Sequence, residues 1–460
     1  ENENEIPNFL LQAAKTSTPI TVAAGLTANT GAGLAFGGAV LSLEKLNSIS
    51  DVKIAENGRH FIDVQAGARL SDIKQKVLAQ NFMYPPDPTE QNSTIGGNIS
   101  TNASGARGFK FGPTRNYVKA LTIVFTDGSI AEIQRGQNFA DANGNISFAS
   151  SKGIKHITLP KYKLPEIKNS AAYFNHPFCD VIDVFIGSEG TLGVITNISL
   201  FVLPKYKNIF SGIIFFNDEN TLFNFADDIK NKKNNINALA LEYFDKNTLD
   251  FIRDDYLQVP NSCQALMFEQ DIYTGDDEDE ILQKWTDLID SYGINFEDVW
   301  FAGDLTQTQK LRDFRHKIPQ KTNEIVHKTG IRKVGSDFAV EQKYIKQIID
   351  FCHSEFHKSN LLNLIFGHIG ENHLHANIIA KTKDEFLYAQ EIYKTIVQKA
   401  ISFGGTVSAE HGIGKTRLIF LEQMLGTNAL IEMAKLKKSL DPAAILGRGN
   451  IFSKELLDRV

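Results

Sequence analysis

Residues 85–118 read PPDPTEQNSTIGGNISTNASGARGFKFGPTRNYV. The segment places five glycines among eleven serine, threonine and asparagine residues. Glycine lets a backbone approach a ligand closely, and successive exposed N–H groups form concavities that hold anions. Tight turns that need positive φ would also account for one such loop. The composition therefore indicates either a set of turns or a loop that binds a phosphate-containing ligand through its backbone.

Two further segments share this character. Residues 29–38 read NTGAGLAFGG and lie between predicted strands at 20–24 and 39–43, and residues 187–196 read GSEGTLGVIT. The first has the spacing G-x-G-x-x-x-G and precedes a strand, whereas a nicotinamide-binding Rossmann fingerprint opens a helix. Three small-residue polar loops separated by strands therefore favour a long, extended cofactor other than a nicotinamide nucleotide.

The bulk composition limits the function. A chain of 460 residues is longer than a single hydrophobic core usually supports, so two domains are expected. A net charge of −6 makes nucleic acid an unlikely partner. The sequence lacks an apolar run of membrane-spanning length and starts with an acidic segment unlike a signal peptide, which predicts a cytoplasmic protein with at most peripheral membrane contact. The three cysteines are widely separated, so we expect each to be buried and any redox chemistry to use an organic cofactor.

Local patterns predict an α+β organisation with a domain boundary near residue 204. Before it, we expect strands at 61–66 and 193–203, strand structure at 121–133 that folds back at Asp127-Gly128, a helix at 71–80 capped by Ser71, and a loop-rich segment at 141–172. After it, strands alternate with longer amphipathic helices. Strands are expected at 209–216 and 238–244, and helices at 222–230, 278–291, 306–327, 341–357 and 384–403.

A cluster of histidines carries the strongest chemical signal. Residues 366–377 read FGHIGENHLHAN, and residues 408–414 read SAEHGIG. Imidazoles with a carboxylate suit a borderline divalent ion, zinc first and manganese or iron if oxygen ligands complete the shell. His368 and His375 lie seven residues apart, and a turn at 370–372 would bring them together. Each histidine taken alone is more often a hydrogen-bonded core residue, so only the cluster with Glu410 favours a metal.

The three loops resemble those of the FAD-linked oxidases of the vanillyl-alcohol oxidase and p-cresol methylhydroxylase superfamily. The matching segments are N-T-G, P-P-D-P followed by T-I-G-G-N and N-A-x-G, and G-S-E-G-T-L-G-V-I-T; Ala28 departs from the glycine that relatives carry there. The resemblance implies FAD contacts along the pyrophosphate, near the flavin ring and along the adenosine. The residues that the resemblance places in contact with FAD are Asn29, Thr30, Gly31, Pro86, Thr94, Gly96, Gly97, Asn98, Asn102, Ser104, Gly105, Glu189, Gly190 and Ile195. Because residues 25–38 and 85–118 contain no histidine, we expect non-covalent FAD.

The resemblance extends to 2-hydroxy-acid dehydrogenases, which carry H-x-G-x-x-x-L-H-x-N and E-H-G-I-G. It implies that His368, His375 and Glu410 bind the metal, that His411 is the catalytic base, and that Asn377 lines the substrate pocket. His373 stands where relatives often have asparagine and would share a strand face with His375, which leaves two roles open for it: support of the metal ligands from behind, or a purely structural role. Arg315 resembles the arginine that binds the substrate carboxylate, although a surface ion pair on a helix is the more common role of an arginine.

The resemblance covers nearly the whole chain. It implies a two-subdomain FAD-binding domain of the p-cresol methylhydroxylase type at 1–204, a ferredoxin-like α/β substrate (cap) domain with the metal site at 205–415, and a C-terminal segment at 416–460 that packs on the FAD domain. The expected enzyme is an FAD-dependent dehydrogenase that oxidises a small D-2-hydroxy acid, such as D-lactate, glycolate or D-2-hydroxyglutarate.

Its expected partners are the 2-hydroxy acid and an electron acceptor, which is a quinone, a cytochrome or an electron-transfer flavoprotein; a homodimer is compatible with the sequence. Two alternatives stay open. One is an enzyme similar to alkylglycerone-phosphate synthase, although the consecutive histidines of that class are missing. The other is a non-catalytic flavoprotein subunit.

Overall fold

The computed structural model describes residues 2–460 and divides them into two compact units. Unit 1 contains the residues up to Gly105, Gly112–Lys205 and Ser408–Val460. Unit 2 contains Ala106–Phe111 and Tyr206–Val407. The chain passes from unit 1 to unit 2 between Lys205 and Tyr206, and the sequence places a boundary near residue 204. Residues 408–415, which the sequence groups with the cap domain, instead fold with unit 1, and residues 106–111 leave the glycine-rich loop to join unit 2.

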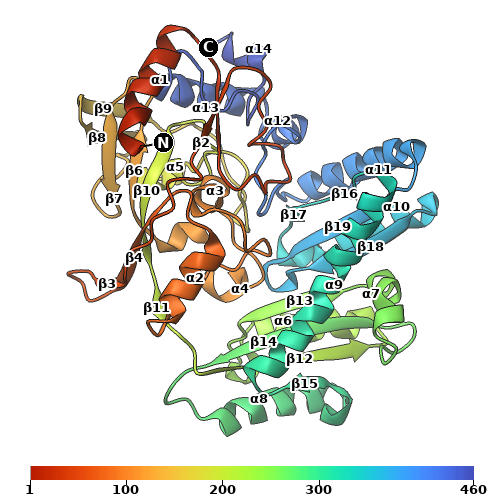
Figure 1. Cartoon of the computed structure of the whole chain (residues 1–460). Helices are drawn as coiled ribbons and strands as arrows, with labels where there is room; N and C mark the ends of the chain where they lie inside the picture. The colour runs from red at the N-terminus through yellow and green to blue at the C-terminus, as the bar shows by residue number, and fades with distance from the viewer. Residues whose placement is uncertain (1) are drawn as a thin grey trace. The chain divides into compact units, whose positions relative to one another are not determined.

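Unit 1 is built on a five-stranded antiparallel sheet in the order β3-β4-β10-β6-β7, with a separate parallel pair β1-β2 (Figure 1). Its strands are β1 (Ile20–Ala23), β2 (Ala39–Ser42), β3 (Lys53–Ile54), β4 (His60–Gln65), β5 (Phe82–Met83), β6 (Val118–Val124), β7 (Ile130–Gln134), β8 (Asn145–Ser150), β9 (Gly153–Thr158), β10 (Val194–Phe201) and β11 (Leu203–Pro204). Its helices are α1 (Ile6–Lys15), α2 (Leu70–Leu78), α3 (Ile95–Thr101), α5 (Val181–Phe185), α12 (Leu418–Leu425), α13 (Thr427–Leu440) and α14 (Lys454–Leu457).

Three local expectations for unit 1 need correction. Helix α2 begins at Leu70 after Arg69, so Ser71 lies inside the first turn and is not the N-cap. Strands β8 and β9 form an antiparallel hairpin within the segment expected to be loop-rich. The glycine-rich segment 85–118 contains helix α3, because its small residues allow a short helix to pack closely against neighbouring backbone.

A buried lysine ties the C-terminal segment to the rest of unit 1. Lys437 on α13 is 1% exposed, forms an ion pair with Asp441 at 2.8 Å, and donates to the carbonyl oxygens of Thr191 at 2.9 Å and Leu446 at 3.0 Å. Thr191 belongs to the third glycine-rich loop. The segment 408–460 is therefore an integral part of unit 1.

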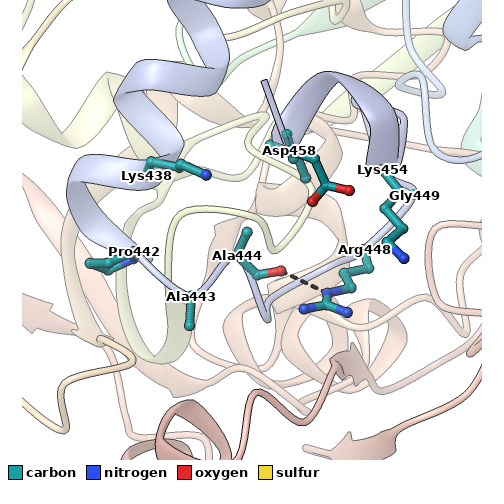
Figure 2. A pocket seen from close by; sticks show the side chains of 9 residues that line it. Lys438, Pro442, Ala443, Ala444, Arg448, Gly449, Lys454 and Asp458 are labelled. Carbon is teal, nitrogen blue, oxygen red and sulfur yellow. Dashed lines mark hydrogen bonds between the residues drawn. The ribbon is translucent and has the colours of Figure 1, made fainter. Parts of the chain in front are cut away.

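The same segment encloses a small cavity of about 110 Å³ (Figure 2). Lys438, Arg448, Lys454 and Asp458 line it, and the Arg448 guanidinium donates to the carbonyl oxygen of Ala444 at 2.9 Å. Its walls come from the turn after α13 and from α14. None of the sequence-predicted site residues lines this cavity.

Unit 2 is built on one large sheet in the order β15-β12-β14-β13-β18-β19-β16, with β17 paired to β19. Its strands are β12 (Asn208–Phe216), β13 (Ala240–Phe244), β14 (Gln264–Ile272), β15 (Trp300–Ala302), β16 (Val334–Gly335), β17 (Phe338–Ala339), β18 (Leu362–Gly367) and β19 (His373–Ile379). Its helices are α4 (Gly108–Phe111), α6 (Glu219–Lys230), α7 (Lys246–Ile252), α8 (Glu278–Ser291), α9 (Leu305–Thr329), α10 (Ile345–Ser359) and α11 (Lys383–Ser402). In the first half, β12-α6-β13 and β14-α8-β15 form a ferredoxin-like βαββαβ order with antiparallel neighbours, and α7 is inserted between β13 and β14.

Helices cover both faces of the unit 2 sheet. Helices α6, α8, α10 and α11 pack on one face around residues such as Phe225, Trp285 and Ile348. Helices α7 and α9 pack on the other face around Leu249 and Phe314. The longer helices match the sequence prediction closely, because their apolar residues recur with helical period. Helices α8, α9 and α11 also have a capping side chain; α8, for example, begins after Asp277, whose side chain accepts from the Glu280 N–H.

Strand alternation then decides which residues of β18 and β19 face α9. Leu374, Ala376 and Ile378 join the α10 and α11 side, whereas Ile379 joins the α9 side. Side chains alternate along a strand, so the odd-numbered residues 373, 375 and 377 face the α9 side. The histidines of the second motif therefore belong to the same layer as helix α9.

Across residues 2–460, none of the helices combines the length and the apolar character that crossing a membrane would require. The three cysteines, Cys179, Cys263 and Cys352, are buried and unbridged, as expected.

Candidate functional site

The first glycine-rich loop connects the parallel strands β1 and β2. Thr30 is 1% exposed, and Gly31 has φ +74°, a conformation that favours glycine. The Thr30 hydroxyl donates to the carbonyl oxygen of His411 at 3.5 Å, and its carbonyl oxygen accepts from the Lys415 N–H at 2.9 Å. Asn29 precedes them on the exposed part of the loop. This loop therefore contacts the segment that carries His411 within unit 1.

The second glycine-rich loop starts helix α3 after Thr94. A Cβ at Gly96 would lie 2.9 Å from the carbonyl oxygen of Ala66, so only glycine fits. A Cβ at Gly97 would meet just the Thr94 hydroxyl, at 3.4 Å, which leaves this side of the backbone accessible. The loop therefore brings its backbone close to strand β4 on one side and leaves room on the other.

Asn98 tests whether the second loop fits a bound cofactor. Its side-chain Nδ2 is buried and has no hydrogen-bond partner among residues 2–460. Buried amides are nearly always hydrogen-bonded in folded proteins. An acceptor supplied by a ligand would satisfy this donor, so the loop fits the FAD that the sequence predicts there. Pro86 lies on the approach to this loop, in a buried stretch.

The end of the second loop is held in a strained conformation. Asn102 ends α3 with φ +52°, and its Oδ1 accepts from the Arg115 N–H at 3.0 Å. Gly105 has φ +87°, and a Cβ there would overlap the carbonyl oxygen of Asp87. Ser104 is 1% exposed. Tight backbone packing therefore fixes the conformation of residues 102–105.

The third loop uses a buried carboxylate. Glu189 has φ +52° and is 4% exposed, and its carboxylate accepts from the N–H groups of Ile413 at 2.7 Å and Gly414 at 2.6 Å. Burial raises the pKa of Glu189 to about 7, although the two N–H donors act in the opposite direction. Gly190 follows with φ +71°, and Ile195 lies on β10. The Glu189 carboxylate is thus used to hold the EHGIG segment.

Glu410 has three donors within unit 1. Its Oε1 accepts from the Lys168 Nζ at 2.6 Å, the Ser104 hydroxyl at 2.9 Å and the Gly105 N–H at 3.0 Å. The side chains of Lys168 and Glu410 are 7% and 11% exposed. A carboxylate with this much support keeps one orientation, which is what a metal ligand requires. Three of the predicted FAD and metal residues, Ser104, Gly105 and Glu410, therefore meet in one hydrogen-bonded group.

In unit 2, the histidine motif forms a β-hairpin. Strand β18 ends at Gly367, a short 3-10 helix covers Ile369–Glu371, and Asn372 has φ +54° before β19 starts. The register pairs Phe366 with His375. Gly370 is required at the turn, because a Cβ there would lie 2.7 Å from the Phe109 ring of α4. The turn expected at 370–372 is present, and it brings the histidines on either side of it together.

Three imidazoles gather beside this hairpin. One ring nitrogen from each of His368, His373 and His375 lies within 4.8 Å of the others. The ring centroids are separated by 5.2 Å for His368 and His373, 4.6 Å for His373 and His375, and 5.7 Å for His368 and His375. Imidazole nitrogens at this spacing need only small rotations to bind one divalent ion. The three rings therefore fit a metal site.

Arg315 is a buried residue of α9 and not a surface one. It is 6% exposed, and its Nε donates to Glu242 Oε2 at 2.8 Å. The other oxygen of Glu242 contacts the Nδ1 of His368. Burial would raise the pKa of Glu242, but the charges of Arg315 and His368 outweigh it and lower that pKa to about 2. A single carboxylate thus connects the predicted substrate arginine with a predicted metal ligand.

Asn377 lies on β19 opposite Gly335 of β16. It is 3% exposed, and a Cβ at Gly335 would overlap its side-chain oxygen. Asn377 faces the same side of the sheet as His373 and His375. The strand therefore presents two imidazoles and a carboxamide in one row.

Sequence reasoning missed three residues that support these groups: Glu242, Asp337 and Lys168. Glu242 had a readable signal, because it is the only charged residue in the apolar strand ALEYF, and a buried charge inside a strand usually has a partner. Asp337 contacts His373 from the segment between β16 and β17. Lys168 lies in an irregular segment with no periodic pattern that could have singled it out.

Comparisons with known proteins agree with these features. Residues 205–451 match the family model for the C-terminal domain of FAD linked oxidases, and residues 1–134 match the model for an FAD binding domain. The chain is 27% identical to a D-lactate dehydrogenase of Anaerostipes hadrus, over 95% of this chain and 85% of that one. It is 28% identical to the glycolate oxidase subunit GlcD of Bacillus subtilis, over 92% of this chain and 81% of that one.

A solved structure of an alkyldihydroxyacetonephosphate synthase has the same fold, with a TM-score of 0.64 and 13% identity, covering 97% of this chain and 75% of that one. The match to the C-terminal model extends over more than half of the 460 residues, and the FAD binding model covers the first two glycine-rich loops. The chain therefore belongs to the FAD-linked oxidase family, a family of flavin-dependent enzymes.

Proposed function

We propose that the protein is an FAD-dependent dehydrogenase that oxidises a small D-2-hydroxy acid to the 2-oxo acid. The observation that carries this proposal is the row of polar groups on the α9 side of the unit 2 sheet. A buried guanidinium, Arg315, and three imidazoles share this face with the Glu242 carboxylate that contacts Arg315 and His368. A guanidinium matches a carboxylate, and imidazoles suit a metal that binds a hydroxyl oxygen.

The names of similar proteins support the same substrate class. Relatives that match most of this chain are named D-lactate dehydrogenase, glycolate oxidase subunit and D-2-hydroxyglutarate dehydrogenase. All three names refer to 2-hydroxy acids that carry a carboxylate beside the hydroxyl. The synthase with the same fold has 13% identity, which supports the fold and no activity.

In the proposed mechanism, Arg315 binds the substrate carboxylate, and Asn377 lines the pocket. Glu242 holds the Arg315 guanidinium in place through its Nε. His411 accepts the proton of the substrate hydroxyl while the hydrogen on C2 leaves with its electron pair. FAD, when bound along the three loops of unit 1, supplies the acceptor for that hydride.

We further propose that His368, His375 and Glu410 hold a divalent ion, zinc in the first place. The ion, when bound, acts as a Lewis acid that lowers the pKa of the substrate hydroxyl. Glu410 keeps its orientation through Lys168, Ser104 and Gly105. We expect FAD to be held without a covalent bond, and the electron acceptor to be a quinone, a cytochrome or an electron-transfer flavoprotein.

The test is anaerobic bleaching of the flavin by a panel of hydroxy acids. D-lactate, L-lactate, glycolate, D-2-hydroxyglutarate and L-2-hydroxyglutarate would each be mixed with the holoenzyme, followed by turnover with an artificial electron acceptor. We expect at least one D-acid or glycolate to bleach the flavin faster than any L-acid. If no 2-hydroxy acid reduces the flavin, the proposed function is wrong.

A further inference from the structure

His368, His373 and His375 share a second property besides their proximity. Each ring has one nitrogen beside an oxygen of the protein. The partners are Glu242 Oε1 for His368 Nδ1, Asp337 Oδ1 for His373 Nε2 at 2.9 Å, and the Ser336 carbonyl oxygen for His375 Nδ1 at 3.4 Å. Histidines that bind metals almost always have such an outer oxygen partner, which sets the tautomer and the orientation of the ring.

His373 fits this pattern at least as well as the two histidines that the sequence assigns to the metal. It is 0% exposed, and so is the side chain of Asp337. A carboxylate that accepts from Nε2 keeps the proton on that nitrogen, so Nδ1 is the atom with a lone pair to offer. The ring centroid of His373 is 4.6 Å from that of His375 and 5.2 Å from that of His368, so the three rings form a compact triangle.

The strand geometry explains why His373 reaches the other two rings. It is two residues before His375 on β19, and residues two apart on a strand face the same side. Ligand nitrogens in a tetrahedral zinc site lie about 3.4 Å apart, given Zn–N bonds of about 2.0 to 2.1 Å. The ring nitrogens here lie within 4.8 Å of one another, so small changes of χ angle suffice.

We propose that His373 is a ligand of the same ion, so that unit 2 supplies three imidazoles from one β-hairpin. The proposal rests on the metal site of the proposed function and goes beyond the two histidines assigned there. Three nitrogen donors favour zinc or cobalt over magnesium, calcium or manganese.

The experiment measures metal binding directly. The full chain with FAD bound would be freed of metal and titrated with Zn²⁺ and with Co²⁺ in competition with a chelator, and X-ray absorption would count the imidazole ligands. His373→Asn removes the ligand, and Asp337→Asn keeps the ring but removes its outer partner. His357→Asn, an exposed histidine on α10, is the control. Circular dichroism and thermal unfolding would verify that each variant is folded.

We expect three imidazoles in the wild type and two in His373→Asn. Because loss of an outer partner typically weakens metal binding about 10- to 100-fold, we expect that change for Asp337→Asn, more than about 100-fold for His373→Asn, and none for His357→Asn. Two imidazoles in the wild type, or an unchanged affinity in His373→Asn, overturn the inference and leave the proposed function intact. Full hydroxy-acid oxidation by metal-free protein would instead contradict the metal in the proposed function.

Discussion

The two units bury carboxylates in opposite ways. Glu189 in unit 1 is stabilised by backbone N–H groups, and burial raises its pKa to about 7. Glu242 in unit 2 is equally buried, but the charges of Arg315 and His368 outweigh burial and lower its pKa to about 2. At Glu189 burial outweighs the two N–H donors and the nearby charges of Arg417 and Lys415, whereas at Glu242 the two cationic groups in direct contact outweigh burial.

This difference follows the construction of the two sites. Unit 1 uses loops in which glycines and backbone groups leave room for a cofactor. Unit 2 uses a rigid sheet and one long helix that hold charged side chains in pairs. We therefore expect substitutions in unit 1 to act through backbone conformation and the proton acceptor, and substitutions in unit 2 to act through uncompensated charge.

The largest expected effect is that of His411→Ala on turnover. Loss of a proton acceptor lowers rates by about 100- to 10,000-fold, so kcat for the best hydroxy acid should fall by that factor. Flavin content should stay at the wild-type level, because His411 contacts the first loop through its backbone carbonyl. His176→Ala, an exposed histidine of unit 1, is the control. A variant at position 411 that keeps wild-type turnover would remove this residue from the mechanism.

Gly105→Ala should be the most damaging backbone change in unit 1. The added Cβ would overlap the Asp87 carbonyl oxygen at a residue with φ +87°. We expect a loss of at least about 4 kcal/mol in the free energy of unfolding, measured by urea denaturation, together with loss of flavin. Gly136→Ala has a similar φ of +90° but open space around it, so it should cost only about 1 kcal/mol. Equal losses in the two variants would show that close packing at 105 is unimportant.

Glu242→Gln should destabilise unit 2 by leaving Arg315 buried without its counter-charge. Breaking a buried ion pair costs about 3 to 5 kcal/mol, so thermal unfolding should shift to a clearly lower temperature. Asp250→Asn breaks the ion pair between Asp250 and Arg253. The Asp250 side chain is 44% exposed, so this substitution should cost less than about 1 kcal/mol. A similar loss of stability in both variants would show that burial does not make the Glu242–Arg315 pair more important than the exposed Asp250–Arg253 pair.

The smallest expected effect is a pH dependence from Glu189. Its folded pKa of about 7 lies above the ordinary value of 4.5, so the folded state binds this proton more tightly than the unfolded state. The resulting contribution to stability is present below about pH 4.5 and is lost as the pH rises through about 7. Glu189→Gln should abolish this slope between pH 5 and pH 8 in urea unfolding of the holoprotein. Glu132→Gln, on an exposed part of β7, should keep it.

Much of the fold could be predicted because it is locally encoded. Helices α8, α9, α10 and α11 appear close to the expected bounds, since each has an apolar stripe of helical period and turn or capping residues at its ends. The short helix α3 was missed because glycine and serine have low helix propensity, and contacts with backbone outside the helix, such as that of Gly96 with Ala66, stabilise it.

The motifs of the candidate site could be predicted from the sequence, but the residues that form ion pairs with them could not. The turn between His368 and His375 could be expected from glycine and asparagine within four residues. The pairing of Arg315 with Glu242 could not, because the two residues are 73 positions apart and meet only when α9 packs on β13. The same reasoning applies to Lys168 and Glu410, which are 242 positions apart.

The amino-acid sequence alone thus determined the loops, the hairpin and the types of ligand, because glycine positions, turn residues and histidine spacing act over a few neighbouring residues. Only the folded chain decided that Arg315 is buried, that Glu189 holds the EHGIG segment, and that His373 joins the two other imidazoles. The physical reason is that the ionisation and orientation of a buried group depend on whichever distant strand or helix packs beside it.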